Sequence, residues 1–209
     1  MIELPAVAAL VQRTKALAAL DLILSPEWES RYYSFNSAWA ASERMASMRN
    51  GSGDEWWLVF HASGWAALKG LAHESQAWSD GGGDLSVAIQ NAFPAELTAF
   101  THEPAFCWDS TSFGYFYLPS ASCWRRANDA TSFSDLDAGD DYLLRHLTGG
   151  PSDYVSFVEE YYEKTIPLSV VTDVFREAPI TQVVISALNP EITIDDIAKE
   201  LYSEIGYSR

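Results

Sequence analysis

The sequence predicts an α+β fold: an N-terminal helix, a mainly antiparallel β-sheet built as a meander, and a C-terminal helical layer. Alternating apolar and polar runs separated by turn residues fill residues 31–72, which is typical of consecutive strands. Apolar residues at helical spacing precede these runs and return after residue 140. With 209 residues, 48% of them hydrophobic, the chain can bury one sizeable core. We therefore expect one domain over 1–209, with helix and sheet in 1–139 and helices packed on them in 140–209.

A first helix is expected over residues 5–22, because Pro5 suits a first turn and one apolar stripe follows it. The stripe consists of Val7, Leu10, Val11, Thr14, Leu17 and Ala18. Four strands should then form the meander: RYYSF (31–35), ERMASMR (43–49), EWWLVFHA (55–62) and WAALKGLA (65–72). The glycine-rich residues 50–54 (NGSGD) provide the clearest turn.

The third of these strands is expected inside the sheet, because both of its faces are largely apolar. Trp56 and Trp57 point to opposite faces, since successive side chains alternate along a strand. One of them can therefore reach a partner, and Trp57 is our candidate; the alternative is that both are buried.

The remaining chain is expected to contain a flexible loop, a short helix, two more strands and a polar connector before the helical part. The loop covers 79–84 (SDGGGD), the short helix 95–101, the strands 111–118 and 122–126, and the acidic connector 127–141. Helical stripes then occur at Tyr154, Phe157, Val158 and Tyr161, at Leu168, Val171, Val174 and Phe175, and at Ile194, Ile197, Ala198, Leu201 and Ile205. Thr193 is the expected N-cap of the last helix and Gly206 its stop.

The net charge of −16 is spread unevenly. Residues 1–79 carry 6 basic and 8 acidic side chains, residues 80–139 carry 2 and 8, and residues 140–209 carry 5 and 13. A strongly acidic chain repels phosphate backbones, so nucleic acid is excluded as a partner. The acidic connector and helices are either a solvated surface or a face that docks a basic protein.

The cysteine and N-terminal patterns predict a soluble, cytoplasmic protein. Cys107 and Cys123 are too few for a disulfide-built secreted fold, and we expect two free thiols. Glu3 stands where a signal peptide needs a basic residue, and no apolar stretch reaches the length of a membrane span.

No motif in the sequence identifies a reaction, so no catalytic residue, metal or cofactor is predicted. The candidates for a site assembled from distant residues are His73, Glu74, His102, Glu103 and Cys107. The two His-Glu pairs do not extend to a zinc-binding H-E-x-x-H motif, because Ala77 and Phe106 occupy the second histidine positions. The acidic stretch 135–140 has its glycine one place too early for a calcium loop.

Several segments carry a resemblance to known proteins: RYYSFNSAW, RMASMRNGSGDEWWLVF, GWAALKGLAHES, FPAELTAFTHEPAF and the closing EIGY. Over most of its length the chain resembles a class of bacterial proteins that look like immunity proteins of polymorphic toxin systems. The resemblance implies a small, acidic, cytoplasmic protein that blocks a toxin by binding it. It carries no catalytic signature, and it assigns no role to any single residue.

Our first hypothesis is therefore a non-enzymatic, acidic protein-binding module, an immunity-type inhibitor that occludes a basic toxin domain. The expected partner-binding residues are Trp57, Asp135, Asp137, Asp140 and Asp141. Two alternatives stay open: an enzyme that uses the dispersed His, Glu and Cys residues, and an oligomeric scaffold with a symmetric apolar patch.

Overall fold

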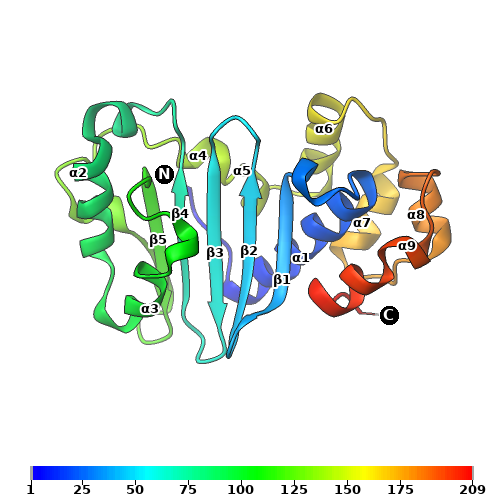
Figure 1. Ribbon diagram of the computed structural model, residues 1–209, viewed down its shortest axis with the longest axis horizontal. Coiled ribbons are helices and arrows are strands. Elements are labelled where there is room, and N and C mark those ends of the chain that lie inside the picture. The colour runs from blue at the N-terminus through cyan, green and yellow to red at the C-terminus, as the bar shows by residue number, and fades with distance from the viewer. Residues whose placement is uncertain (1, 209) are drawn as a thin grey trace.

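The computed structural model describes residues 2–208, and it confirms the α+β class. One antiparallel sheet of six strands runs through the centre in the order β1-β2-β3-β4-β5-β6 (Figure 1). The strands are β1 (Tyr33–Ala40), β2 (Glu43–Arg49), β3 (Glu55–His61), β4 (Ala66–Leu71), β5 (Phe113–Leu118) and β6 (Cys123–Arg126). Each strand pairs with its neighbour in the chain, so the expected meander is confirmed.

Helices pack on both faces of the sheet, but on one face they lie only over its β4–β5 end (Figure 1). On one face lie α1 (Val7–Leu24), α4 (Asp140–Leu143) and α5 (Arg145–Thr148), and beyond α1 lie α6 (Pro151–Tyr161), α7 (Leu168–Phe175), α8 (Gln182–Leu188) and α9 (Ile194–Lys199). On the other face lie α2 (Gln76–Ala92) and α3 (Thr98–Thr101). Short non-α turns complete the chain: η1 (Trp28–Ser30), η2 (Ala95–Leu97), η3 (Pro104–Phe106), η4 (Ala127–Ala130) and the π-turn η5 (Glu200–Glu204).

β3 lies inside the sheet, as its two apolar faces predict. Trp56 points to the face covered by α1 and α4, where it is 1% exposed and donates its indole N–H to the carbonyl oxygen of Leu143 at 3.2 Å. Trp57 points to the opposite face, where it is half-buried and stacks on Phe106 of η3. The two tryptophans therefore lie on opposite faces of the sheet, as the alternation of side chains along a strand requires.

α1 is buried on every side over its second half, and not along a single stripe. All residues from Ala16 to Leu24 are buried, including Asp21. The helix lies between the sheet and the C-terminal helices, so both of its sides face other elements (Figure 1). A helix enclosed in this way needs apolar residues all round, which the run ALAAL supplies.

The flexible loop expected over 79–84 is wrong, because these residues belong to α2. Ser75 caps the helix by accepting a hydrogen bond from the backbone N–H of Trp78 at 3.3 Å. The helix bends at Gly82, whose φ of 47° lies outside the helical region. Leu85 and Ile89 then anchor the second half in the core, and this burial outweighs the weak helix propensity of three consecutive glycines.

The last helix begins as predicted, with reciprocal hydrogen bonds between Thr193 and Asp196 in a capping box. The chain then makes a π-turn and reaches Gly206, whose φ is 69°. Within residues 2–208, no helix combines the length and apolar character needed to cross a lipid bilayer.

Candidate functional site

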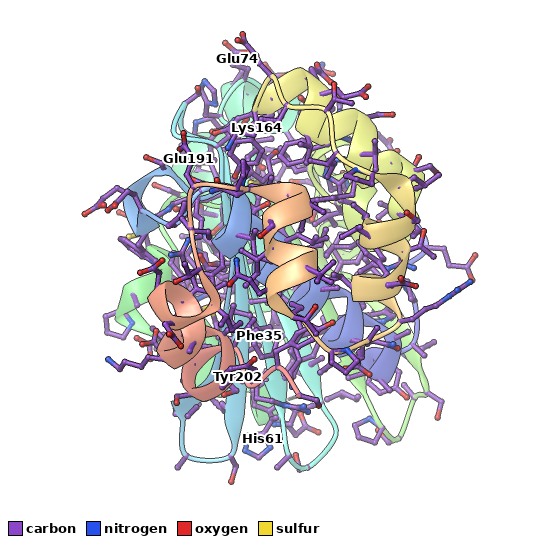
Figure 2. All side chains as sticks on the ribbon, turned by 90° about the vertical axis from the view of Figure 1, so that its right-hand side faces the viewer. Phe35, His61, Glu74, Lys164, Glu191 and Tyr202 are labelled. Carbon is purple, nitrogen blue, oxygen red and sulfur yellow. The ribbon has the colours of Figure 1, made fainter. Side chains whose placement is uncertain are left out.

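The five candidate catalytic residues lie at different places on the sheet. His73 and Glu74 follow β4 at the end of the sheet where β3 begins, and the imidazole of His73 lies 2.7 Å from the carboxylate of Asp54. Glu103 lies at the other end of β3, where its charge acts on Glu43. The seven residues of β3 separate the two groups by ~20 Å. Glu74 at this first end and His61 at the other lie at opposite ends of the molecule in Figure 2.

His102 and Cys107 are engaged locally. His102 Nδ1 lies 3.0 Å from the carbonyl oxygen of Thr98, at the end of α3. Cys107 has an exposed thiol, and it is the carbonyl oxygen of this residue that accepts a hydrogen bond from buried Lys69 at 3.5 Å. Both cysteines are free, as expected. In the part of the chain that the structure describes, no group of three or more His, Cys, Asp or Glu could hold a metal ion.

The acidic connector divides into buried and exposed carboxylates. Asp135, Asp137 and Asp141 are exposed, whereas Asp140 is only 5% exposed. Asp140 accepts hydrogen bonds from the guanidinium of Arg126 at 2.8 and 3.2 Å and from the hydroxyl of Tyr115. Its carboxylate is therefore not part of the exposed acidic surface. Burial, together with this carboxylate, raises the pKa of Tyr115 well above its usual range.

The connector is attached to the segment that follows β4. The carbonyl oxygen of Asp137 accepts a hydrogen bond from the backbone N–H of Ala77 at 2.8 Å. The hydroxyl of Ser112 links the two segments, because it accepts from Ala72 N–H at 2.8 Å and donates to Ala138 at 3.0 Å. The connector therefore lies against the chain just beyond His73 and Glu74.

These contacts bring carboxylates from three separate segments to one end of the sheet. They are Asp54 of the turn between β2 and β3, Glu74 after β4, and Asp137 and Asp141 of the connector. We call these four residues the acidic end. Asp54 is held by the backbone N–H and imidazole of His73, and Glu74 has a side chain that is 88% exposed. The contact of Asp54 with His73 raises the pKa of that imidazole.

Trp57 and the acidic end are separate features. Trp57 lies under η3, with its ring 5.3 Å from that of Phe106. The ring of Trp39 also stacks on Phe106, with the two ring centres 6.0 Å apart. The indole N–H of Trp57 is buried and has no hydrogen-bond partner among the described residues. Part of the Trp57 side chain reaches solvent, but the ring belongs mainly to the aromatic packing of this sheet face.

A second polar cluster, which the sequence analysis missed, lies between α1, β1 and α6. The carboxylate of Asp21 is fully buried and accepts hydrogen bonds from Tyr154 at 2.5 Å, from the backbone N–H of Tyr33 at 2.6 Å and from Tyr162 at 3.1 Å. Burial raises the pKa of Asp21 to about 6, and these hydrogen bonds oppose the rise. The cluster links elements far apart in the chain, so its role is structural.

His146 lies beside this cluster and lines a hollow of about 360 Å³ between α5 and α6. Carboxylates of Asp153 and Glu160 line the same hollow. Both imidazole nitrogens already face protein groups, the Tyr33 hydroxyl at 2.5 Å and Arg145 Nε at 3.3 Å. Burial, with the charge of Arg145, lowers the pKa of His146 to about 4. Because it is neutral and both of its nitrogens have protein partners, this imidazole stabilises the fold and is poorly placed to transfer a proton to a substrate.

A groove of about 1010 Å³ runs along β6 and the N-terminal segment. β6 is the last strand of the sheet, so its outer edge has no strand partner within residues 2–208. Trp124 closes part of the groove by donating its indole N–H to the carbonyl oxygen of Pro5 at 2.8 Å. None of the site residues predicted from sequence lines this groove.

No protein family, curated protein or solved structure matches this chain.

Proposed function

We propose that this protein is a non-enzymatic binding module whose acidic end docks a basic surface of a partner protein. The partner we infer is a toxin domain, so that the protein acts as an immunity-type inhibitor by occluding it. The observation that carries the proposal is the meeting of Asp54, Glu74, Asp137 and Asp141 from three segments at one end of the sheet.

The charge of the whole chain supports the same function. A net charge of −16 produces a long-range field that attracts a basic partner and speeds its encounter. Local carboxylates then orient the partner, because complementary charges favour one docked arrangement over others. Occlusion needs no reacting group, which agrees with the engagement of His102 and His146 in local contacts.

The enzyme alternative is not favoured by the geometry of its candidates. His73 and Glu74 lie ~20 Å from Glu103 along β3, whereas a general acid and a nucleophile must act on one substrate at hydrogen-bond distance. The scaffold alternative predicts a symmetric dimer, which light scattering or analytical ultracentrifugation would detect.

The test uses the purified product of a neighbouring toxin-like reading frame. Wild-type protein should bind this product at low salt and lose association rate as salt rises. The triple variant Glu74→Gln, Asp137→Asn and Asp141→Asn should associate about ten-fold more slowly, because the local field is weakened.

A matched control removes the same charge elsewhere. Asp173→Asn, Glu191→Gln and Asp195→Asn change exposed carboxylates of the α7–α9 layer and should leave most of the association rate intact. Absence of binding to the neighbouring product would contradict the proposed function. An equal loss in both triple variants would mean that only total charge matters and that the acidic end is not the docking site.

A further inference from the structure

Three aromatic side chains protrude at the same end of the sheet as the acidic end. Trp28 of η1, Tyr142 of α4 and Tyr161 of α6 are 56%, 57% and 41% exposed. Tyr32 lies among them: its ring is 4.9 Å from that of Tyr161, and Tyr142, Tyr161 and Asp54 are near enough to add to the rise in its pKa that burial mainly causes. Trp28 and Tyr161 both contact the end of β2. Trp28 packs on Arg49, and the hydroxyl of Tyr161 donates a hydrogen bond to the carbonyl oxygen of Asn50.

Each exposed ring is held by a specific contact with another group of the protein. The guanidinium of Arg49 lies 3.6 Å from the ring centre of Trp28, and that of Arg145 lies 4.4 Å from the ring centre of Tyr142. Tyr161 stacks on Phe157 at 5.2 Å and is fixed by its hydrogen bond to Asn50 at 3.3 Å. Rings held in this way lose little conformational entropy when a partner covers them.

Carboxylates lie close to the rings, and the nearby cations Arg49 and Arg145 already pack on two of these rings. Glu29 follows Trp28, Asp141 precedes Tyr142, Glu160 precedes Tyr161, and Asp54 acts on the Tyr32 hydroxyl between them. Arg49 and Arg145 each occupy one face of a ring, that of Trp28 and that of Tyr142. A second cation stacked on the opposite face of either ring would be repelled by the first. The opposite ring faces therefore favour apolar groups, and the carboxylates favour cations.

We propose that this surface, the aromatic end, docks a protein partner with an apolar centre and a rim of lysine and arginine. The aromatic end consists of Trp28, Tyr142 and Tyr161 with the carboxylates of Glu29, Asp54, Asp141 and Glu160. The inference rests on the proposed function in one respect, that the protein binds another protein. It adds the rings that anchor the partner and the chemistry of the partner's face.

A second copy of this chain does not fit as the occupant. A symmetric contact would place the same carboxylates of two molecules against each other, and each molecule carries a net charge of −16. The other exposed large apolar side chains, Val87, Leu168 and Val183, come from α2, α7 and α8 and supply controls for the rings.

The test uses two synthetic peptides as probes and the whole chain as receptor. One peptide combines leucine with lysine in an amphipathic helix, and the other is polylysine of equal charge. Two-dimensional NMR follows the Trp28 indole N–H, assigned with Trp28→Phe, and the backbone amides. We expect the leucine–lysine peptide to shift the Trp28 indole and residues 50–54, and to bind more tightly than polylysine.

Substitutions then separate the rings from the charges. The double variant Trp28→Ser, Tyr142→Ser should bind the leucine–lysine peptide about ten-fold more weakly than wild type. Its affinity for polylysine should be unchanged, because only the apolar anchors are removed. The control Leu168→Ser with Val183→Ser should bind both peptides as wild type does. Dispersed amide spectra verify folding, and Trp28→Phe, which keeps an aromatic ring, should retain most of the affinity.

Absence of peptide binding at millimolar concentration, shifts confined to α7–α9, or equal affinity in the ring variant would each overturn the inference. These experiments need no natural partner. A failure of the neighbouring reading frame's product to bind would therefore contradict the proposed toxin partner and leave the peptide result to decide the aromatic end.

Discussion

The hydroxyl of Tyr154 donates a hydrogen bond of 2.5 Å to the buried carboxylate of Asp21. This contact joins α6 to α1, two helices between which all six strands of the sheet lie in the sequence. Tyr33 adds its backbone N–H from β1, so one carboxylate connects three elements. The position of α6, which carries Tyr161, therefore depends on a titratable group in the core.

The first prediction concerns Asp21→Asn and the pH dependence of stability. The pKa of Asp21 is about 6 in the folded chain and 3.8 in the unfolded chain, so folding favours the protonated carboxyl. This term stabilises the fold fully below pH 3.8 and is lost as pH rises through 6. Relative to Asp21→Asn, wild type should gain about 2 kcal/mol in unfolding free energy between pH 7 and pH 4. Urea unfolding at several pH values measures this difference.

His146 gives the second prediction, with the opposite sign. Its pKa is about 4 in the folded chain and 6.5 in the unfolded chain, so folding favours the neutral imidazole. This term is present above pH 6.5 and lost as pH falls toward 4. Between pH 7 and pH 4, the unfolding free energy of His146→Gln should therefore fall by about 3 kcal/mol less than that of wild type. An NMR titration in which the His146 imidazole becomes charged near pH 6.5 would contradict the prediction.

The strands and their meander could be predicted from the sequence because their signals are local, whereas the full order of the six strands in the sheet was not predicted. Each apolar run is bounded by turn residues, and the connections between β1 and β4 are too short for anything but antiparallel neighbours. The interior position of β3 followed from its two apolar faces, and the start of the last helix from Thr193 as its N-cap. Local reasoning was wrong at residues 81–83, because tertiary packing of Leu85 and Ile89 continues α2 beyond the kink at Gly82.

The buried polar groups could not be predicted, because their partners are distant in the chain. Asp21 meets Tyr154 and Tyr162 across more than a hundred residues, and sequence alone shows only a carboxylate in an apolar helix. Asp140 was assigned to the acidic surface from its neighbours, yet Arg126 holds it in the interior. Tyr161 was expected on a buried stripe, but it lies in the last turn of α6 and is 41% exposed.

The third prediction distinguishes Asp140 from the exposed carboxylates of the connector. Asp140→Asn leaves the guanidinium of Arg126 buried without a full counter-charge, which should cost about 3 kcal/mol of unfolding free energy. Asp135→Asn changes an exposed side chain and should alter the unfolding free energy by less than about 0.5 kcal/mol. Chemical denaturation of both variants at pH 7 makes the comparison. Equal stability of the two variants would show that the Arg126 contact contributes little.

Gly70 and Gly83 provide the last prediction, since they test packing against the sheet and helix propensity separately. A Cβ at Gly70 would lie 2.1 Å from the buried ring of Phe113 on β5, so Gly70→Ala forces this ring or the backbone around it to move. We expect a loss of about 2 kcal/mol or more in unfolding free energy. Gly83 is an exposed helical position in α2 with no atom within 4 Å of its would-be Cβ, so Gly83→Ala should gain about 0.5–1 kcal/mol.

Thermal and urea unfolding of the two glycine variants measure both effects under the same conditions. Adding Phe113→Leu to Gly70→Ala removes the ring that the new methyl group meets. The double variant should therefore lose less than the sum of the two single changes, because residues in direct contact are not additive. Additive losses would mean that the ring and the methyl group do not meet, and that β4 and β5 are packed less closely at this position than the Gly70–Phe113 contact requires.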